Sequence, residues 1–90
     1  MEQNTLVNTE TALREFIQQR FKVPANDPDF TDSTHLFDYG YIDSFGAAEL
    51  TTFVEQTFEV KVTESDLVLY PMNTIQEIAR FVGKRKGGEI

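Results

Sequence analysis

Apolar residues recur at helical spacing in three stretches of the chain, with polar and charged residues between them. This period places the apolar side chains on one stripe of a helix, which can then pack against a core. The first pattern runs from Thr9 or Thr11 to about Phe21, the second spans residues 44–58, and the third follows Thr74. The apolar positions are Ala12, Leu13, Phe16, Ile17 and Phe21 in the first, Phe45, Ala48, Leu50, Phe53, Val54 and Phe58 in the second, and Ile75, Ile78, Ala79, Phe81 and Val82 in the third.

Hydroxyl and carboxyl side chains mark the starts of the helices. Residues 74–77 (TIQE) have the form of a capping box, in which the first and fourth side chains bond each other's backbone N–H groups. The last helix is therefore expected to begin there. Residues 63–66 (TESD) have the same form with Asp in place of Glu, and they predict a short helix through residue 69. Asp43 and Ser44 stand directly before the second pattern.

Proline and glycine mark the ends of the helices. Pro24 ends the first helix, because the residue before a proline avoids the helical conformation. Pro71 stops the short helix, and Gly83 is expected to terminate the last one. No strand pattern or internal repeat appears. The chain thus predicts an all-α fold, a four-helix bundle of three main helices and one short helix.

A long loop, residues 24–43, joins the first two main helices. Loops of this length in a small domain are usually functional or well packed. Phe30, Leu36 and Phe37 are expected to anchor the loop to the core, and Gly40 supplies the conformational freedom to turn the chain toward the second helix.

The length of 90 residues allows one domain. It is expected over residues 9–83, with a flexible N-terminus over 1–8 and a flexible basic and Gly-containing tail over 84–90. The absence of cysteine excludes disulfides, thiolate zinc sites and a thiol nucleophile, and it fits a cytoplasmic protein. No apolar run is long enough to span a bilayer, and the first residues do not form a secretory signal, so no membrane insertion is expected.

The net charge of −7 is unevenly distributed. Residues 23–60 contain eight acidic residues and no Lys or Arg. Nucleic-acid binding needs a basic surface, so this charge pattern argues against binding to nucleic acid, and no nucleic-acid partner is expected. The acidic surface suits docking against basic patches on other proteins, and acidic faces also keep small proteins soluble.

Ser44 has two interpretations, both based on its position at a helix start. It can serve as an ordinary cap, since Ser and Asp are common there. Alternatively, its hydroxyl is the attachment point of a phosphate-linked group, because the backbone N–H groups and the dipole of a helix N-terminus favour an anion.

Other candidate chemistry is weaker. His35, Asp38 and Ser44 have the side chains of a hydrolytic triad, but the G-x-S-x-G motif is absent. Asp27 and Asp29 open a pattern similar to a calcium-binding loop, but Asp32 occupies the position of the required glycine. No catalytic residue and no metal site are therefore predicted, and the protein is not expected to be an enzyme.

Residues 36–45 (LFDYGYIDSF), followed by Glu49-Leu50 and by the helix pattern at 74–79, resemble the signature of acyl carrier proteins. The resemblance covers about residues 9 to 83. It implies that Ser44 receives 4′-phosphopantetheine from coenzyme A and that Asp43 is the acidic motif residue before it. The thiol of the group would carry an acyl or aminoacyl unit as a thioester, on a four-helix bundle with a short third helix.

The same resemblance implies the partners. A phosphopantetheinyl transferase would modify Ser44, an adenylating enzyme or an acyltransferase would load the thiol, and a ketosynthase or condensation enzyme would accept the cargo. The chain itself would act as a monomer. The residues expected to dock these enzymes are Phe45, Ala48, Glu49, Glu55 and Glu59.

Two residues separate Gly40 from Asp43, where fatty-acid carriers commonly have one. This spacing is similar to D-alanyl carrier proteins and to freestanding carriers of polyketide and nonribosomal peptide assembly lines, and the latter role is favoured. The D-alanyl and fatty-acid roles remain alternatives, as does a helical protein-interaction domain that carries nothing.

The eight phenylalanines bear on the cargo. Their rings on the helical stripes are expected to fill the space between the helices and to leave no slot for a long alkyl chain. Ala47 and Ala48 leave room for a short group at most. A small or polar acyl unit that stays largely in solvent is therefore expected.

Overall fold

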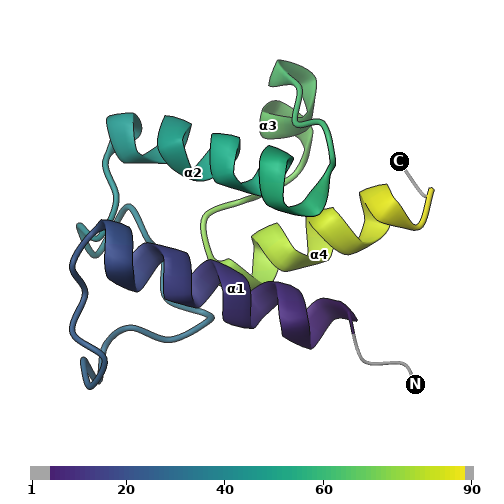
Figure 1. Ribbon diagram of the computed structural model, residues 1–90. Coiled ribbons are helices and arrows are strands. Elements are labelled where there is room, and N and C mark those ends of the chain that lie inside the picture. The colour runs from purple at the N-terminus through teal and green to yellow at the C-terminus, as the bar shows by residue number, and fades with distance from the viewer. Residues whose placement is uncertain (1–4, 89–90) are drawn as a thin grey trace.

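The computed structural model describes residues 5–88, which form four helices joined by loops (Figure 1). They are α1 (Thr5–Arg20), α2 (Ser44–Phe58), α3 (Glu64–Leu69) and α4 (Ile75–Lys86). Helices α1 and α2 lie side by side and run in opposite directions, α4 packs against α1, and the short α3 stands beside α2 (Figure 1). The predicted all-α bundle with a long first loop is confirmed.

The core is built mainly from aliphatic side chains of all three long helices and of the loops. Leu13 and Ile17 of α1 are fully buried, and so are Leu36 of the first loop and Val82 of α4. The other members of the core are Val23, Phe30, Ile42, Leu50, Val54, Val60, Ile75, Ile78, Ala79 and Phe81.

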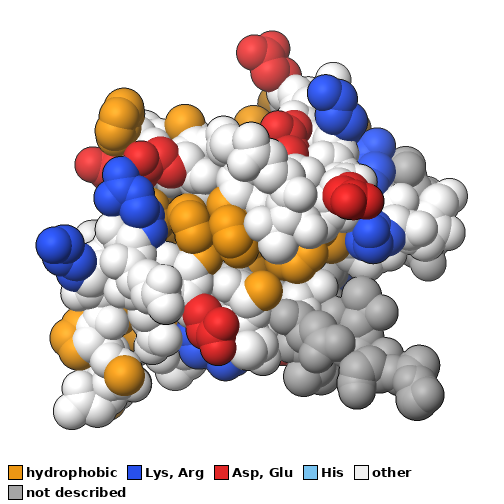
Figure 2. All heavy atoms as spheres, in the orientation of Figure 1, with side chains coloured by type: hydrophobic (Ala, Val, Ile, Leu, Met, Phe, Trp, Pro, Cys, Tyr) orange, Lys and Arg blue, Asp and Glu red, His pale blue; other side chains and the backbone are white. Residues whose placement is uncertain are grey.

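Four of the phenylalanines are less buried than predicted. Phe16, Phe21, Phe53 and Phe58 are only half-buried, and they form a row of rings between α1 and α2. Phe16 stacks on Phe53 with ring centroids 4.1 Å apart, while edge contacts of 6.1 Å and 6.0 Å extend the row to Phe21 and Phe58. A band of hydrophobic surface is visible between the two helices in Figure 2. The expectation that these four rings are buried in the interior is wrong, since they pack against the edge of a mostly aliphatic core, whereas Phe81 is buried as expected.

Two helix boundaries differ from the prediction. Helix α1 begins at Thr5, before the expected start at Thr9 or Thr11, so residues 5–8 of the expected flexible segment are helical; residues 1–4 lie outside the described part of the chain. Helix α4 continues through Gly83 to Lys86. A glycine within a helix is tolerated at a cost of ~1 kcal/mol, and the basic side chains of the last turn stabilise the helix C-terminus.

The capping residues of α3 and α4 are as predicted, but one hydrogen bond at the start of α4 has a different donor. Thr63 and Asp66 bond each other's backbone N–H groups, so the box with Asp in the fourth position is complete. Thr74 caps α4 by accepting the N–H of Glu77, but the Glu77 carboxylate accepts the N–H of Asn73 rather than that of Thr74. The full box predicted at 74–77 is therefore only half formed.

The first loop is fastened to the N-terminus of α4. The N–H of Leu36 donates to the Asn73 carbonyl at 2.8 Å, and that of Gln76 donates to the Asp32 carbonyl at 3.0 Å. The Asp32 carboxylate also forms an ion pair with Arg14 of α1. Nη2 of Arg14 lies 2.7 Å from Oδ1 and 2.6 Å from Oδ2 of Asp32. Phe30 and Leu36 are buried and Phe37 is half-buried, as expected of anchors. These contacts fix the loop end from which α2 begins.

Candidate functional site

Ser44 is the first residue of α2 and is exposed. The cap of this helix is Asp43, whose Oδ1 accepts the N–H of Gly46 at 2.8 Å and whose carbonyl accepts that of Ala47 at 2.8 Å. The capping role is thus filled by the neighbour, and the interpretation of Ser44 as the cap is wrong. Because Ala47 makes the first helical bond, the N–H groups of Ser44 and Phe45 have no acceptor within the helix. An exposed hydroxyl therefore stands beside two free donors at the positive end of a helix dipole.

The chain before Ser44 is held by its backbone and by two side chains. Gly40 has a φ of 80°, which provides the predicted turn. The N–H groups of Tyr41 and Ile42 both donate to the carbonyl of Leu36, and the Ile42 side chain is buried. The Tyr41 hydroxyl donates to Asp27 at 2.9 Å. Burial, followed by this hydrogen bond and the charge of Asp27, raises the pKa of Tyr41 to about 12, so the phenol stays neutral near pH 7.

Gly46 permits a close contact beside the attachment point. A Cβ at this position would lie 2.7 Å from Cε1 of Phe21 and 3.0 Å from Cγ2 of Ile42. The ring of Phe21 can therefore rest against the first turn of α2 only because residue 46 has no side chain. The sequence gives a hint of this contact, because a glycine inside a predicted helix often marks a place where another group packs closely.

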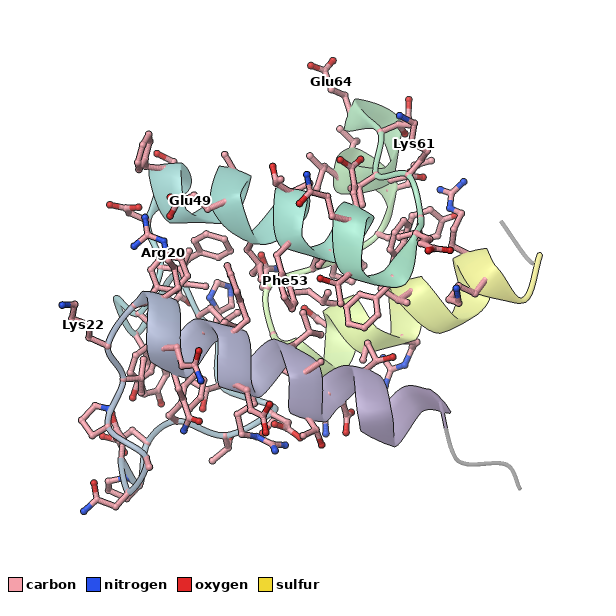
Figure 3. The ribbon with its side chains drawn as sticks, viewed as in Figure 1. Arg20, Lys22, Glu49, Phe53, Lys61 and Glu64 are labelled. Carbon is pink, nitrogen blue, oxygen red and sulfur yellow. The ribbon has the colours of Figure 1, made fainter. Side chains whose placement is uncertain are left out.

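Two of the acids expected to dock partners are engaged within the protein. Glu49 pairs with Arg20 of α1 at 2.5 Å, and the two side chains point toward each other in Figure 3. The Glu55 carboxylate accepts the N–H of Val62 at 2.8 Å and so supports the turn after α2. Glu59 is exposed at the end of α2 in a left-handed conformation with a φ of 57°. Phe45 and Ala48 are exposed, outside the buried stripe of the helix.

An apolar cavity of about 160 Å³ is bordered by α2 from Ala47, one helical turn after Ser44, to Val54. Ala47 lines it, as expected of a small residue on this helix, whereas Ala48 faces solvent. The other lining residues are Phe37, Leu50, Thr51, Val54, Val62, Leu67, Met72, Asn73 and Ile78. Phe37 is the one phenylalanine among them, because the other rings lie between α1 and α2, elsewhere in the core or, for Phe45, in solvent.

The weaker chemical candidates have structural roles. His35 accepts the N–H of Asp38 on Nδ1 at 3.1 Å and closes a turn of the first loop. Within residues 5–88, no group of three or more His, Asp or Glu side chains is arranged to hold a metal ion. None of the helices described is long and apolar enough to cross a membrane.

Comparison with known protein families gives a match over most of the chain. The family model described as a phosphopantetheine attachment site aligns with residues 11–82, which is most of the chain. The search of curated proteins found no match. The aligned region contains the first loop, Ser44 and all of α2 and α3.

Proposed function

The chain belongs to the family of phosphopantetheine-bearing carrier domains, and on that premise we propose that Ser44 is the residue that bears the group. The observation that carries the proposal is the exposed hydroxyl at the first position of α2, next to the unpaired N–H groups of Ser44 and Phe45. Ester formation at this oxygen places a phosphate where a helix N-terminus stabilises negative charge. Members of this family are carriers rather than catalysts, and transferases modify them.

The residues present fit a phosphodiester. The Ser44 oxygen would supply the ester link, and the backbone N–H groups of Ser44 and Phe45 would be available as donors to the phosphate. One carboxylate oxygen of Asp43 accepts the N–H of Gly46 and so stabilises the start of α2. The Asp43 side chain is exposed beside Ser44. When bound, the prosthetic group supplies the thiol that carries an acyl unit as a thioester. The transferase would contribute the base and the metal ion.

The cavity supports a short cargo. A cavity of about 150 Å³ holds a molecule the size of benzene, so a volume of about 160 Å³ accommodates a chain of about six carbon atoms. The walls are mostly apolar, with Thr51 and Asn73 as polar members. We therefore propose a small acyl or aminoacyl unit as cargo, either in solvent or with its apolar end in the cavity.

A polyketide or peptide assembly line is the favoured setting, on the basis of the two-residue spacing between Gly40 and Asp43. Its adenylating enzyme or acyltransferase would load the arm, and a ketosynthase or condensation enzyme would unload it. A D-alanyl carrier would use the same short cargo, and a fatty-acid carrier would need a longer cavity.

Mass spectrometry tests the attachment site. The protein is incubated with coenzyme A and a phosphopantetheinyl transferase of broad specificity, and the intact mass is followed. The wild type should gain one phosphopantetheine and Ser44→Ala none. Ser33→Ala and Ser65→Ala are matched controls, because these are the other two serines of the chain and both are exposed. Modification of Ser44→Ala, or no modification of the wild type, would contradict the proposal.

A further inference from the structure

The cavity beside α2 has two polar residues in an otherwise apolar wall. They are Thr51 of α2 and Asn73, which directly precedes the cap of α4. Leu67 is the residue that α3 contributes to the wall, whereas Val68 and Leu69 after it are exposed, so α3 adds no polar group. In binding cavities of this kind, a few polar groups fix the orientation of the ligand and select it. Thr51 and Asn73 therefore determine which polar group a bound chain can carry.

The backbone of Asn73 is fully hydrogen-bonded, but its side chain is not. Its N–H donates to the Glu77 carboxylate at 2.9 Å, and its carbonyl accepts the N–H of Leu36 at 2.8 Å. The residue is half-buried, and its side-chain amide forms no hydrogen bond with any residue of the described range 5–88. An amide carries N–H donors and a carbonyl acceptor, and leaving such groups without a partner away from water costs free energy. Asn73 is thus a held residue with a polar side chain that a ligand can satisfy.

The hydroxyl of Thr51 has already used its proton. Its Oγ1 donates to the carbonyl of Ala47 at 2.9 Å, one turn earlier in α2. A hydroxyl has a single proton, so the Thr51 oxygen can act toward a ligand only as an acceptor. A group of the ligand that meets Thr51 must therefore be a donor.

These two requirements distinguish between the polar groups that an acyl chain can carry. A hydroxyl donates to Thr51 and accepts from the Asn73 amide, so it serves both residues. A keto oxygen accepts from Asn73 but gives Thr51 nothing. An ammonium group donates, but no Asp or Glu lines the cavity, and burying an unpaired charge is costly. The wall of the cavity is therefore matched best by a hydroxyl.

We propose that the cavity receives a hydroxyacyl chain of about six carbon atoms, whose hydroxyl bonds to Thr51 and Asn73. The inference rests on the proposed function, in which the chain is carried on the arm at Ser44, and it narrows the cargo to one chemical class. A chain without the hydroxyl fits the same volume but leaves the two polar residues unpaired, which is the strongest form of discrimination between similar ligands.

Loaded forms of the protein test this. The acylated arm is transferred to Ser44 from the coenzyme A thioesters of hexanoic, 3-hydroxyhexanoic, 5-hydroxyhexanoic and 3-oxohexanoic acids, and the intact mass verifies loading. The side-chain amide signals of Asn73 are then compared by NMR, together with the backbone amides of Leu50, Val54 and Ile78. One of the two hydroxyl arms should shift the Asn73 side-chain signals relative to hexanoyl, and the keto arm should shift them less. The two hydroxyl positions sample two depths in the cavity.

Variants of equal size identify the residues responsible. Thr51→Val removes the hydroxyl, and Asn73→Leu removes the amide while keeping the backbone bonds of residue 73. In both variants the hydroxyl and hexanoyl arms should give the same backbone shifts. Thr52→Val is the matched control, because the Thr52 hydroxyl makes the same kind of bond, to the Ala48 carbonyl at 3.1 Å, but the residue is exposed and outside the cavity wall. It should preserve the difference between the arms.

The outcomes separate the two proposals. If the wild type is loaded but neither hydroxyl arm moves the Asn73 side-chain signals, the hydroxyacyl inference is overturned and the attachment site stands. Equal losses in Thr51→Val and Thr52→Val would also contradict it. A wild type that gains no mass overturns both proposals. The wild-type spectra decide the question even if a variant fails to fold.

Discussion

Asp66 of α3 and Arg85 of α4 form a direct ion pair that joins these two helices, with Oδ1 2.5 Å from Nη2. The Arg85 guanidinium also lies over the ring of Phe81, 5.2 Å from its centroid. The backbone N–H of Thr63, the Thr63 hydroxyl and Arg85 lower the pKa of Asp66, and burial opposes them. The pair therefore depends on the ionised carboxylate, and it holds in place the helix whose apolar residues face outward.

The lowered pKa of Asp66 predicts a loss of stability in acid. Because the folded-state pKa lies below the unfolded value of about 3.9, the stabilisation is present above that value and is lost as the pH falls through the folded pKa. Urea unfolding of the wild type and of Asp66→Asn should differ most near pH 7, and the difference should shrink below about pH 4. Ser65→Ala serves as the control in the same helix. A difference that stays constant down to pH 3 would contradict the assignment.

Gly83→Ala is expected to stabilise the protein by ~0.5–1 kcal/mol. Gly83 lies inside α4, and a Cβ there would meet no atom within 4 Å. The substitution therefore removes backbone freedom from the unfolded chain without a clash. Chemical denaturation measures the change. A destabilised Gly83→Ala would indicate that α4 ends at this residue, as the sequence pattern alone suggests.

Gly46→Ala, in contrast to Gly83→Ala, should destabilise the protein. Its Cβ would overlap the Phe21 ring, and such overpacking costs ~1–3 kcal/mol, more than the gain in helix propensity. The double-mutant cycle with Phe21→Ala isolates the contact: Gly46→Ala should cost less, or become stabilising, in the Phe21→Ala background. Equal effects in both backgrounds would show that the ring is not the cause.

Glu55→Ala is predicted to destabilise the protein by ~1–2 kcal/mol, because the Val62 N–H loses a charged acceptor. Glu59→Ala is the matched control: an exposed acid near the end of the same helix, whose loss should stay within about 0.5 kcal/mol. Thermal and urea unfolding of the two variants give the comparison. Similar stabilities for both would mean that Glu55 is available for partners after all.

In this chain the sequence predicts the starts of α2 and α3 better than it predicts the end of α4. Helix α2 has the predicted bounds of Ser44 and Phe58, and α3 has its predicted capping box, because Asp43 and Thr63 act on donors within three residues. The end of α4 was missed because Gly83 is compatible with either a helix interior or a helix end, and the contacts of the folded domain favour the interior.

The distribution of rings and charges was less predictable, because it depends on residues far apart in the sequence. Arg20 is 29 positions from Glu49, and the local absence of basic residues around Glu49 gave no indication of the pair. Helical periodicity places Phe16 and Phe53 on the correct faces, but it does not reveal that they stack at the edge of the core. The cavity has the same origin, since the residues that line it come from the first loop, α2, α3 and α4.

The cavity predicts how the cargo behaves when it is attached to Ser44. Amide chemical shifts are compared between the protein loaded with acetyl, hexanoyl and dodecanoyl arms. Hexanoyl should shift the amides of Leu50, Val54 and Ile78, because its chain fits the cavity of about 160 Å³. Acetyl is too short to enter, and dodecanoyl should add no deeper shifts because the cavity holds only about six carbon atoms.

Two alanines give the matched variants for this experiment. Ala47→Phe should abolish the hexanoyl shifts, since its side chain would occupy the cavity, whereas Ala48→Phe should preserve them, because residue 48 is exposed on the same helix. The comparison controls for ring-current effects, as both variants add one aromatic ring. If hexanoyl and acetyl arms give the same spectrum in the wild type, the cargo stays in solvent and the cavity has no part in holding it. Progressive shifts with dodecanoyl would instead show that the helices separate to admit long chains, and they would favour the fatty-acid role.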